Sequence, residues 1–330
     1  MKYQNIVNDN KVQCEICPRK CRLKKGQRGF CYVRKNIEGK ITLETYGYNT
    51  GLAIDPVEKK PMYHFYPASN ALSFGTYGCI MGCLFCQNSH ITKVQMPIET
   101  CTKAAPDEII RVAKKYNCKS IAFTYNDPVT FLEYAIDTAK LAKQENIKTI
   151  AVTSGYINSE AAVEFFSLMD GANIDLKGFS EEFYTKNCGA HLKPVLDTIE
   201  YAVNETNCFV ELTTLIIEGL NDKDIEKECD WIVEKLGTDV PIHFSAFSPR
   251  YKFSDKLPTK YETLLKAYKI AKSKGINYVY TGNLSTTETS TTYCKHCKKP
   301  LIIRNGYKIV ENNLEGDLCK FCKTKVDGRF

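Results

Sequence analysis

The chain has 330 residues, a formal net charge of +7 and 43% hydrophobic residues, a length and composition that fit one large catalytic domain with small appendages. No apolar run approaches the about 20 residues that a membrane span requires. The first residues also lack the apolar segment of a secretory signal, so we expect a cytoplasmic protein with no membrane contact.

The chain begins with a basic, cysteine-rich segment. Residues 1–35 contain Cys14, Cys17, Cys21 and Cys31 and hold 10 basic against 2 acidic residues, a net charge of +8. The spacing C-x2-C-x3-C-x9-C suits a metal knuckle that binds either structural zinc, which we favour, or a second iron–sulfur cluster. Residues 40–66 follow as short strands and turns.

From residue 71 the pattern changes to alternating strands and helices. Strands are expected at 71–77, 119–125, 148–154, 172–178, 208–217, 241–247 and 276–282, and helices at 106–116, 129–144 and 261–275. Such alternation predicts an α/β fold with a parallel sheet and right-handed crossovers. We expect a partial or complete β/α barrel whose active site lies at the C-terminal strand ends.

A cysteine triplet directly follows the first of these strands. The segment 75–91, GTYGCIMGCLFCQNSHI, spaces Cys79, Cys83 and Cys86 as C-x3-C-x2-C. Three thiolates can hold three irons of a [4Fe–4S] cluster and leave the fourth iron open, whereas structural zinc prefers four protein ligands. Gly78 and Gly82 allow the loop to wrap closely around the metal. The triplet therefore predicts a [4Fe–4S] cluster at the mouth of the barrel.

With Phe85 included, the segment resembles the C-x3-C-x-Φ-C signature of the radical S-adenosylmethionine (SAM) superfamily. The resemblance implies that the open iron chelates SAM and that electron transfer cleaves it to methionine and a 5′-deoxyadenosyl radical. This radical abstracts hydrogen from a substrate. The resemblance further implies that Phe85 packs near adenine and that an electron donor such as ferredoxin or flavodoxin serves the enzyme.

Polar segments follow the next strands, where the resemblance places SAM contacts. Asn126 and Asp127 occupy the position of a Gly-Gly-Glu-Pro motif, whose polar groups meet the SAM amino group. Thr153 and Ser154 stand where relatives usually show Thr-Asn-Gly.

Further candidates end the later strands. Asp175 and Lys177 in DLK project from the same face of a strand, and this segment contacts SAM in pyruvate formate-lyase activators, although an ordinary salt bridge explains the pair equally well. His243 is expected to hydrogen-bond the ribose or adenine, with a satisfied core histidine as the alternative. Asn283 ends the last strand. No residue is singled out as catalytic.

The chain ends in a second basic cysteine module. Cys294, Cys297, Cys319 and Cys322 form two C-x2-C knuckles in residues 293–330, which hold 9 basic against 4 acidic residues, a net charge of +5. Paired knuckles at this separation predict a zinc ribbon. The other cysteines are expected to be small buried apolar residues; these are Cys101, Cys118, Cys188, Cys208 and Cys229.

The resemblance extends beyond the cluster motif. Segments 14–31, 45–69, 219–226, 243–252 and 278–283 resemble the radical SAM enzymes of the AmmeMemoRadiSam system. This implies AMMECR-type and MEMO-type partner proteins, but no substrate. We therefore expect an N-terminal cysteine-rich module with a β extension (1–70), a radical SAM barrel (71–285) and a C-terminal zinc-ribbon-like module (286–330).

Three functions remain open at this stage. The first is a radical SAM enzyme that acts on its substrate together with those partners. The second is an activase of a glycyl-radical enzyme, which Val152 weakens because the activators usually carry Asp at that position. The third is a zinc-containing RNA-binding or RNA-modifying protein, since the basic modules suit an anionic partner as well as they suit compensation of metal–thiolate charge.

Overall fold

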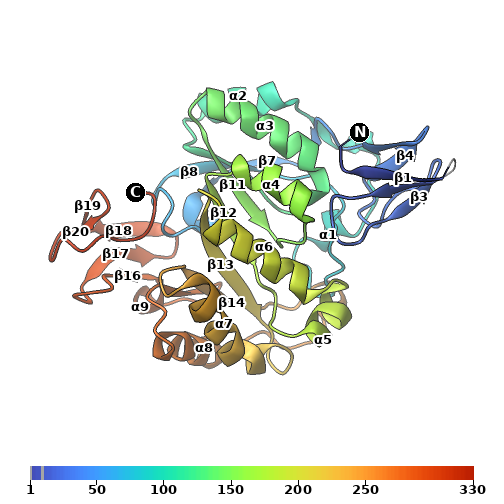
Figure 1. Cartoon of the computed structure of the whole chain (residues 1–330). Helices are drawn as coiled ribbons and strands as arrows, with labels where there is room; N and C mark the ends of the chain where they lie inside the picture. The colour runs from blue at the N-terminus through green and yellow to red at the C-terminus, as the bar shows by residue number, and fades with distance from the viewer. Residues whose placement is uncertain (1, 9–10) are drawn as a thin grey trace.

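An eight-stranded sheet forms the centre of the computed structural model, which describes residues 2–8 and 11–330 (Figure 1). Its strand order is β15-β14-β13-β12-β11-β10-β8-β7. The strands are β7 (Leu52–Pro56), β8 (Asn70–Phe74), β10 (Ser120–Phe123), β11 (Lys148–Thr153), β12 (Gly171–Asp175), β13 (Phe209–Ile216), β14 (Ile242–Ala246) and β15 (Val279–Gly282). All neighbours pair in parallel except β7 and β8.

The expected α/β fold is confirmed, and the sheet is a partial barrel because β15 and β7 remain at its two edges. The strands expected from residue 71 onward are all present. The sheet nevertheless starts earlier in the chain, since β7 lies upstream of the boundary that we expected at residue 70.

Helices between the strands cover the outer face of the sheet (Figure 1). The longer ones are α2 (Pro106–Lys115), α3 (Leu132–Gln144), α4 (Ser159–Ser167), α6 (Leu192–Asn204), α7 (Ile225–Leu236) and α8 (Tyr261–Ser273). Short helices are α1 (Ser89–Thr92), α5 (Glu181–Phe183) and α9 (Thr287–Ser290). Helix α2 illustrates the local rules, because it starts with Pro106, carries acidic residues in its first turn and basic residues in its last.

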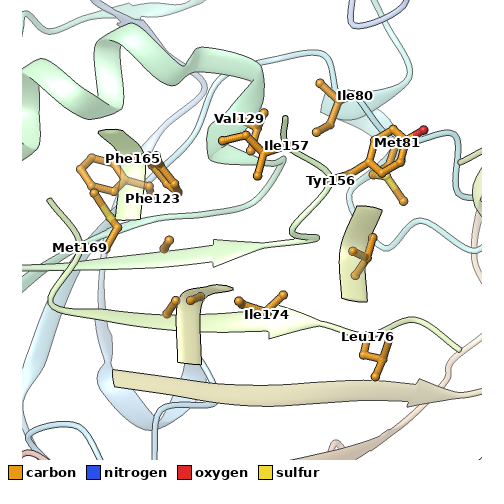
Figure 2. Close-up of a cluster of buried hydrophobic side chains, with 14 of the residues drawn as sticks. Ile80, Met81, Phe123, Val129, Tyr156, Ile157, Phe165, Met169, Ile174 and Leu176 are labelled. Carbon is orange, nitrogen blue, oxygen red and sulfur yellow. The ribbon is translucent and has the colours of Figure 1, made fainter. Parts of the chain in front are cut away.

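The main core lies between this sheet and its helices (Figure 2). Phe123 of the sheet lies beside Phe165 and Met169 there, Ile174 belongs to the same cluster, and all four are buried. Residues on both faces of the parallel strands are buried, and most of them are apolar. The same buried cluster includes Ile80 of the loop after β8, so the cysteine-bearing loop is anchored in the core.

The N-terminal module consists of small antiparallel units. Strands β1 (Gln4–Asn8), β2 (Lys11–Cys14) and β3 (Arg22–Lys24) form one sheet, and β4 (Arg34–Ile37) pairs with β5 (Lys40–Leu43). Strand β6 (Tyr48–Asn49) pairs with β9 (Thr102–Lys103), which comes later in the chain than this module. The module lies beside α1, near the loop that follows β8 (Figure 1).

The C-terminal module lies at the other end of the barrel (Figure 1). Its strands are β16 (Thr292–Tyr293), β17 (Pro300–Asn305), β18 (Lys308–Asn312), β19 (Leu314–Glu315) and β20 (Leu318–Cys319). Buried Arg304 joins it to the segment between β7 and β8 by donating to the carbonyl oxygen of Tyr63 at 2.7 Å. Across the described residues, every helix is too short or too polar to cross a membrane.

Candidate functional site

A cavity of about 290 Å³ lies at the C-terminal ends of the parallel strands. The loop after β8 forms one wall, and the ends of successive strands form the others. Nearly all residues expected at the site line it: Cys79, Cys83, Phe85, Cys86, Asn126, Asp127, Thr153, Ser154, Asp175, Lys177 and Asn283. Residues that are far apart in the sequence thus meet at one cavity, where ligands of such barrels bind.

The three thiols of the loop after β8 are free and face this cavity. A hydrogen bond with the thiol of Cys188, together with the nearby ammonium groups of Lys177 and Lys93, lowers the pKa of Cys83 to about 6 despite its burial. The thiolate is the form that ligates a metal. Burial has the opposite effect on Cys79, whose pKa it raises to about 12. The fit to an iron–sulfur cluster therefore rests on the placement of three free thiols at one cavity, where Cys79, Cys83 and Cys86 would supply the ligands.

Backbone and amide hydrogen bonds fix the cluster loop in place. The side-chain amide of Asn126 donates to the hydroxyl of Thr76 at 3.0 Å and to the carbonyl oxygen of Gly78 at 2.9 Å. On the other side, the amide of Gly82 donates to the carbonyl oxygen of Cys188 at 2.8 Å. The loop conformation is thus set by protein contacts at both ends.

Gly78 allows the N-terminal module to approach this loop. Its φ is +76°, and a Cβ atom at this position would lie 2.0 Å from the carbonyl oxygen of Cys31. A side chain there is excluded by both the backbone conformation and the contact. The two cysteine-bearing segments are therefore in direct van der Waals contact.

Asp127 links the ends of β10 and β11, which form the next part of the cavity wall. Its carboxylate accepts hydrogen bonds from the hydroxyl of Thr153 at 3.0 Å and from the backbone and hydroxyl of Ser154 at 2.8 and 2.5 Å. Burial raises the pKa of Asp127, although these bonds oppose the shift. The carboxylate also accepts from the amide of Val129, so its oxygens mainly hold the ends of β10 and β11 together.

Asp175 and Lys177 form an ion pair on the cavity wall, with Nζ of Lys177 2.9 Å from Oδ2 of Asp175. Burial opposes the charged ammonium, but Asp175 and Cys83 outweigh it and raise the pKa of Lys177. The pair thus presents a cation and an anion side by side beside the thiols.

His243 does not reach the cavity. Ser245, on the same face of β14, lines the cavity, while His243 lies two residues nearer the N-terminal end of that strand. Its Nε2 lies 2.7 Å from Oε2 of Glu211, and the two side chains are only 2% and 0% exposed. This placement does not fit the expected contact with ribose or adenine, because the ring is enclosed in the layer beneath the cavity and held there by a carboxylate.

Sequence reasoning missed several residues that contribute to the wall, all of them close to the cysteine triplet or at strand ends. Thr92 lies with its hydroxyl 3.1 Å from Sγ of Cys86, and the amide of Asn88 donates to the carbonyl oxygen of Tyr125 at 2.6 Å. Lys93 also lines the cavity. Their position directly after the triplet, in QNSHITK, was a usable signal.

The C-terminal thiols form a compact quartet. Sγ of Cys294 lies 3.6 Å from Sγ of Cys322, and Sγ of Cys297 lies 3.8 Å from Sγ of Cys319. A tetrahedral zinc ion with Zn–S bonds of about 2.3 Å places its sulfurs about 3.8 Å apart. The quartet therefore fits one zinc ion or another tetrahedral metal, and the zinc-ribbon-like module is confirmed as a four-cysteine site.

Comparisons with known proteins agree with this site. The sequence profile of the Radical SAM superfamily matches residues 74–232. The uncharacterized protein MJ0808 of Methanocaldococcus jannaschii is 40% identical over 99% of this chain and 98% of its own length. The pyruvate formate-lyase 1-activating enzyme of Escherichia coli K12 is 24% identical over 44% of this chain and 61% of its own length.

Among solved structures, Streptococcus suis SuiB has a similar fold. It matches with a TM-score of 0.51 and 14% identity, over 69% of this chain and 52% of the SuiB chain.

Proposed function

This chain belongs to the radical SAM superfamily, and we propose that it binds a [4Fe–4S] cluster through Cys79, Cys83 and Cys86 and SAM in the adjoining cavity. The observation that carries this proposal is the convergence of three free thiols and the polar strand ends on one cavity. When bound, the cluster would supply the electron that cleaves SAM to methionine and a hydrogen-abstracting 5′-deoxyadenosyl radical.

The residues of the cavity suit the parts of SAM. The ammonium of Lys177 and the carboxylate of Asp175 complement the carboxylate and amino groups of an amino acid, and their side-by-side placement favours binding in one orientation. Phe85 offers an apolar surface for adenine, since its ring packs on Phe183 and Phe253 and lines the cavity. Asn126 and Asp127 mainly keep the walls in place.

We further propose that the enzyme acts with AMMECR-type and MEMO-type proteins. The support is the resemblance of segments 14–31, 45–69 and 243–252 to enzymes of that system, spread over nearly the whole chain. Affinity purification from the native extract without oxygen tests this proposal, and recovery of neither partner type would count against it. Retention of RNA that falls steeply with salt would instead favour the nucleic-acid interpretation of the basic modules.

Activation of a glycyl-radical enzyme is the second candidate. Its support is the similarity to the pyruvate formate-lyase 1-activating enzyme across 44% of this chain. Against it, Val152 contributes an apolar side chain to the cavity where the activators usually carry Asp. A glycyl-radical signal in pyruvate formate-lyase, incubated with the reduced protein and SAM, would favour this candidate.

The central proposal is tested by SAM cleavage. The protein, reconstituted with iron and sulfide without oxygen, should release 5′-deoxyadenosine from SAM when dithionite is added. The triple variant Cys79→Ala, Cys83→Ala, Cys86→Ala should release none, because the open-iron cluster loses all its ligands. Cys101→Ser, which changes a cysteine outside the three groups, is the matched control. Undiminished release by the triple variant would refute the assignment.

A further inference from the structure

The N-terminal module contains a second cavity that is lined by cysteines. All four of its grouped cysteines line this space of about 10 Å³, together with apolar Ile16 and Leu23. Cys14, Cys17 and Cys31 are buried, and the four thiols are free. Four soft ligands around a small apolar cavity indicate a thiolate-ligated metal.

The spacing of the sulfurs distinguishes the three cysteine groups. Within residues 2–8 and 11–330, only the C-terminal quartet brings three or more donor atoms within 4.8 Å of one another. The N-terminal quartet is more open, as is the central triplet that would hold a [4Fe–4S] cluster. In a cubane cluster each thiolate binds a different iron, so its sulfurs lie further apart than they do around one zinc ion.

We propose that Cys14, Cys17, Cys21 and Cys31 ligate a second [4Fe–4S] cluster, in place of the structural zinc that the sequence favoured. With all four irons ligated by protein, this cluster has no open position for SAM. It would therefore exchange electrons only.

Arg34 provides an independent observation. Its guanidinium is 3% exposed, and its two terminal nitrogens bind the carboxylate of Glu133 at 2.8 and 2.7 Å. Its Nε has no hydrogen-bond partner, although the residue lines the cavity. A buried donor without a partner is costly, and a cluster sulfur in this cavity would accept from it. Such hydrogen bonds to sulfur tune the reduction potential of a cluster.

The two metal cavities share one wall. Ile80 lines the N-terminal cavity, while its neighbours Cys79 and Met81 line the SAM cavity. Arg19, also on the N-terminal cavity, donates from its guanidinium to the carbonyl oxygen of Ile80.

This adjacency suits a relay, which rests on the proposed function. The N-terminal cluster would take one electron from a low-potential one-electron donor and would pass it to the cluster held by Cys79, Cys83 and Cys86. The central cluster would thereby be reduced as the N-terminal one is reoxidised.

Metal content tests the proposal without relying on activity. The wild-type protein, purified and reconstituted without oxygen, should contain about eight irons and one zinc per chain. The variant with Cys79, Cys83 and Cys86 changed to Ala should keep about four irons as a [4Fe–4S] cluster, seen by Mössbauer spectroscopy. Two zinc ions and no iron in that variant would overturn the proposal.

Further variants locate the remaining iron. Adding Cys17→Ala to the triple variant should remove it, whereas adding Cys101→Ser should not; loss in both would also overturn the assignment. The outcome separates the two proposals. About four irons in both the wild-type protein and the triple variant would refute only the central site. About four irons in the wild-type protein and none in the triple variant would refute only the N-terminal cluster.

Discussion

Nζ of Lys177 lies 2.9 Å from Oδ2 of Asp175 at the cavity that the thiol of Cys83 also lines. Asp175 ends β12 and Lys177 lies two residues further along the chain, so their side chains share one face. An ion pair on its own is ordinary, but this one lines the same cavity as the three expected cluster ligands.

Replacing this lysine should weaken SAM binding. In Lys177→Met the charge-assisted hydrogen bond to the SAM carboxylate is lost, and such bonds contribute about 1.5–3 kcal/mol. We expect the dissociation constant of SAM to rise by roughly 10- to 100-fold, measured by equilibrium binding to the cluster-loaded protein. Lys193→Met, on the exposed surface of α6, should leave it unchanged. Equal affinities in both variants would remove Lys177 from the site.

Changing His243 should lower the stability of the fold and leave the affinity for SAM unchanged. His243→Leu leaves buried Glu211 without its imidazole partner, and breaking a buried pair on one side costs about 3–5 kcal/mol of unfolding free energy. The affinity for SAM should stay near that of the wild type, because the ring does not line the cavity. Denaturant unfolding and SAM titration together check this. A large loss of affinity in a folded variant would restore His243 as a contact.

Removing the C-terminal metal should affect only its own module. In Cys294→Ser with Cys322→Ser, one of the two closest sulfur pairs is lost, and metal binding worth about 10–16 kcal/mol supports folding of such small modules. We expect about one zinc fewer per chain, an unchanged iron content and new protease cleavage after residue 291. Elemental analysis and limited proteolysis measure these, and a wild-type protein without zinc would contradict the prediction.

Stability should fall as the pH rises because of Glu228. Burial raises the pKa of this residue to about 8 from 4.5, although the hydroxyl of Thr214 donates to it. The folded state thus keeps a proton that the unfolded state releases, so the free energy of unfolding declines between these two values. The decline amounts to roughly 3–5 kcal/mol at about 1.4 kcal/mol per unit of pKa shift.

Glu228→Gln keeps the hydrogen-bonding shape without the titration. Urea unfolding across this pH range should therefore show that the free energy of unfolding declines less steeply with pH in the variant than in the wild type. If the free energy of unfolding changed equally with pH in both proteins, Glu228 would have a pKa near its ordinary value in the folded protein.

The sequence predicted the sheet well because each parallel strand is an apolar run between recognisable helices. It also identified most of the cavity, since strand ends of a barrel meet at one face. It did not reveal that His243 lies in the layer beneath the cavity. There the ring pairs with buried Glu211 of the neighbouring strand β13, a partner that the sequence pattern does not identify. Nor could it choose the metal of the N-terminal module, because sulfur spacing follows from loop conformations that cysteine intervals do not specify.

The hydrogen bonds of Asn126 have a practical consequence. Because this side chain holds Thr76 and Gly78 through protein atoms alone, we expect the start of the cluster loop to keep its shape when the cluster is lost in air. Purified protein that has been bleached should thus recover its absorbance on refilling, without passing through denaturant. We expect the C-terminal quartet to differ, because metal binding supports the folding of such small modules, so chelation there should be hard to reverse.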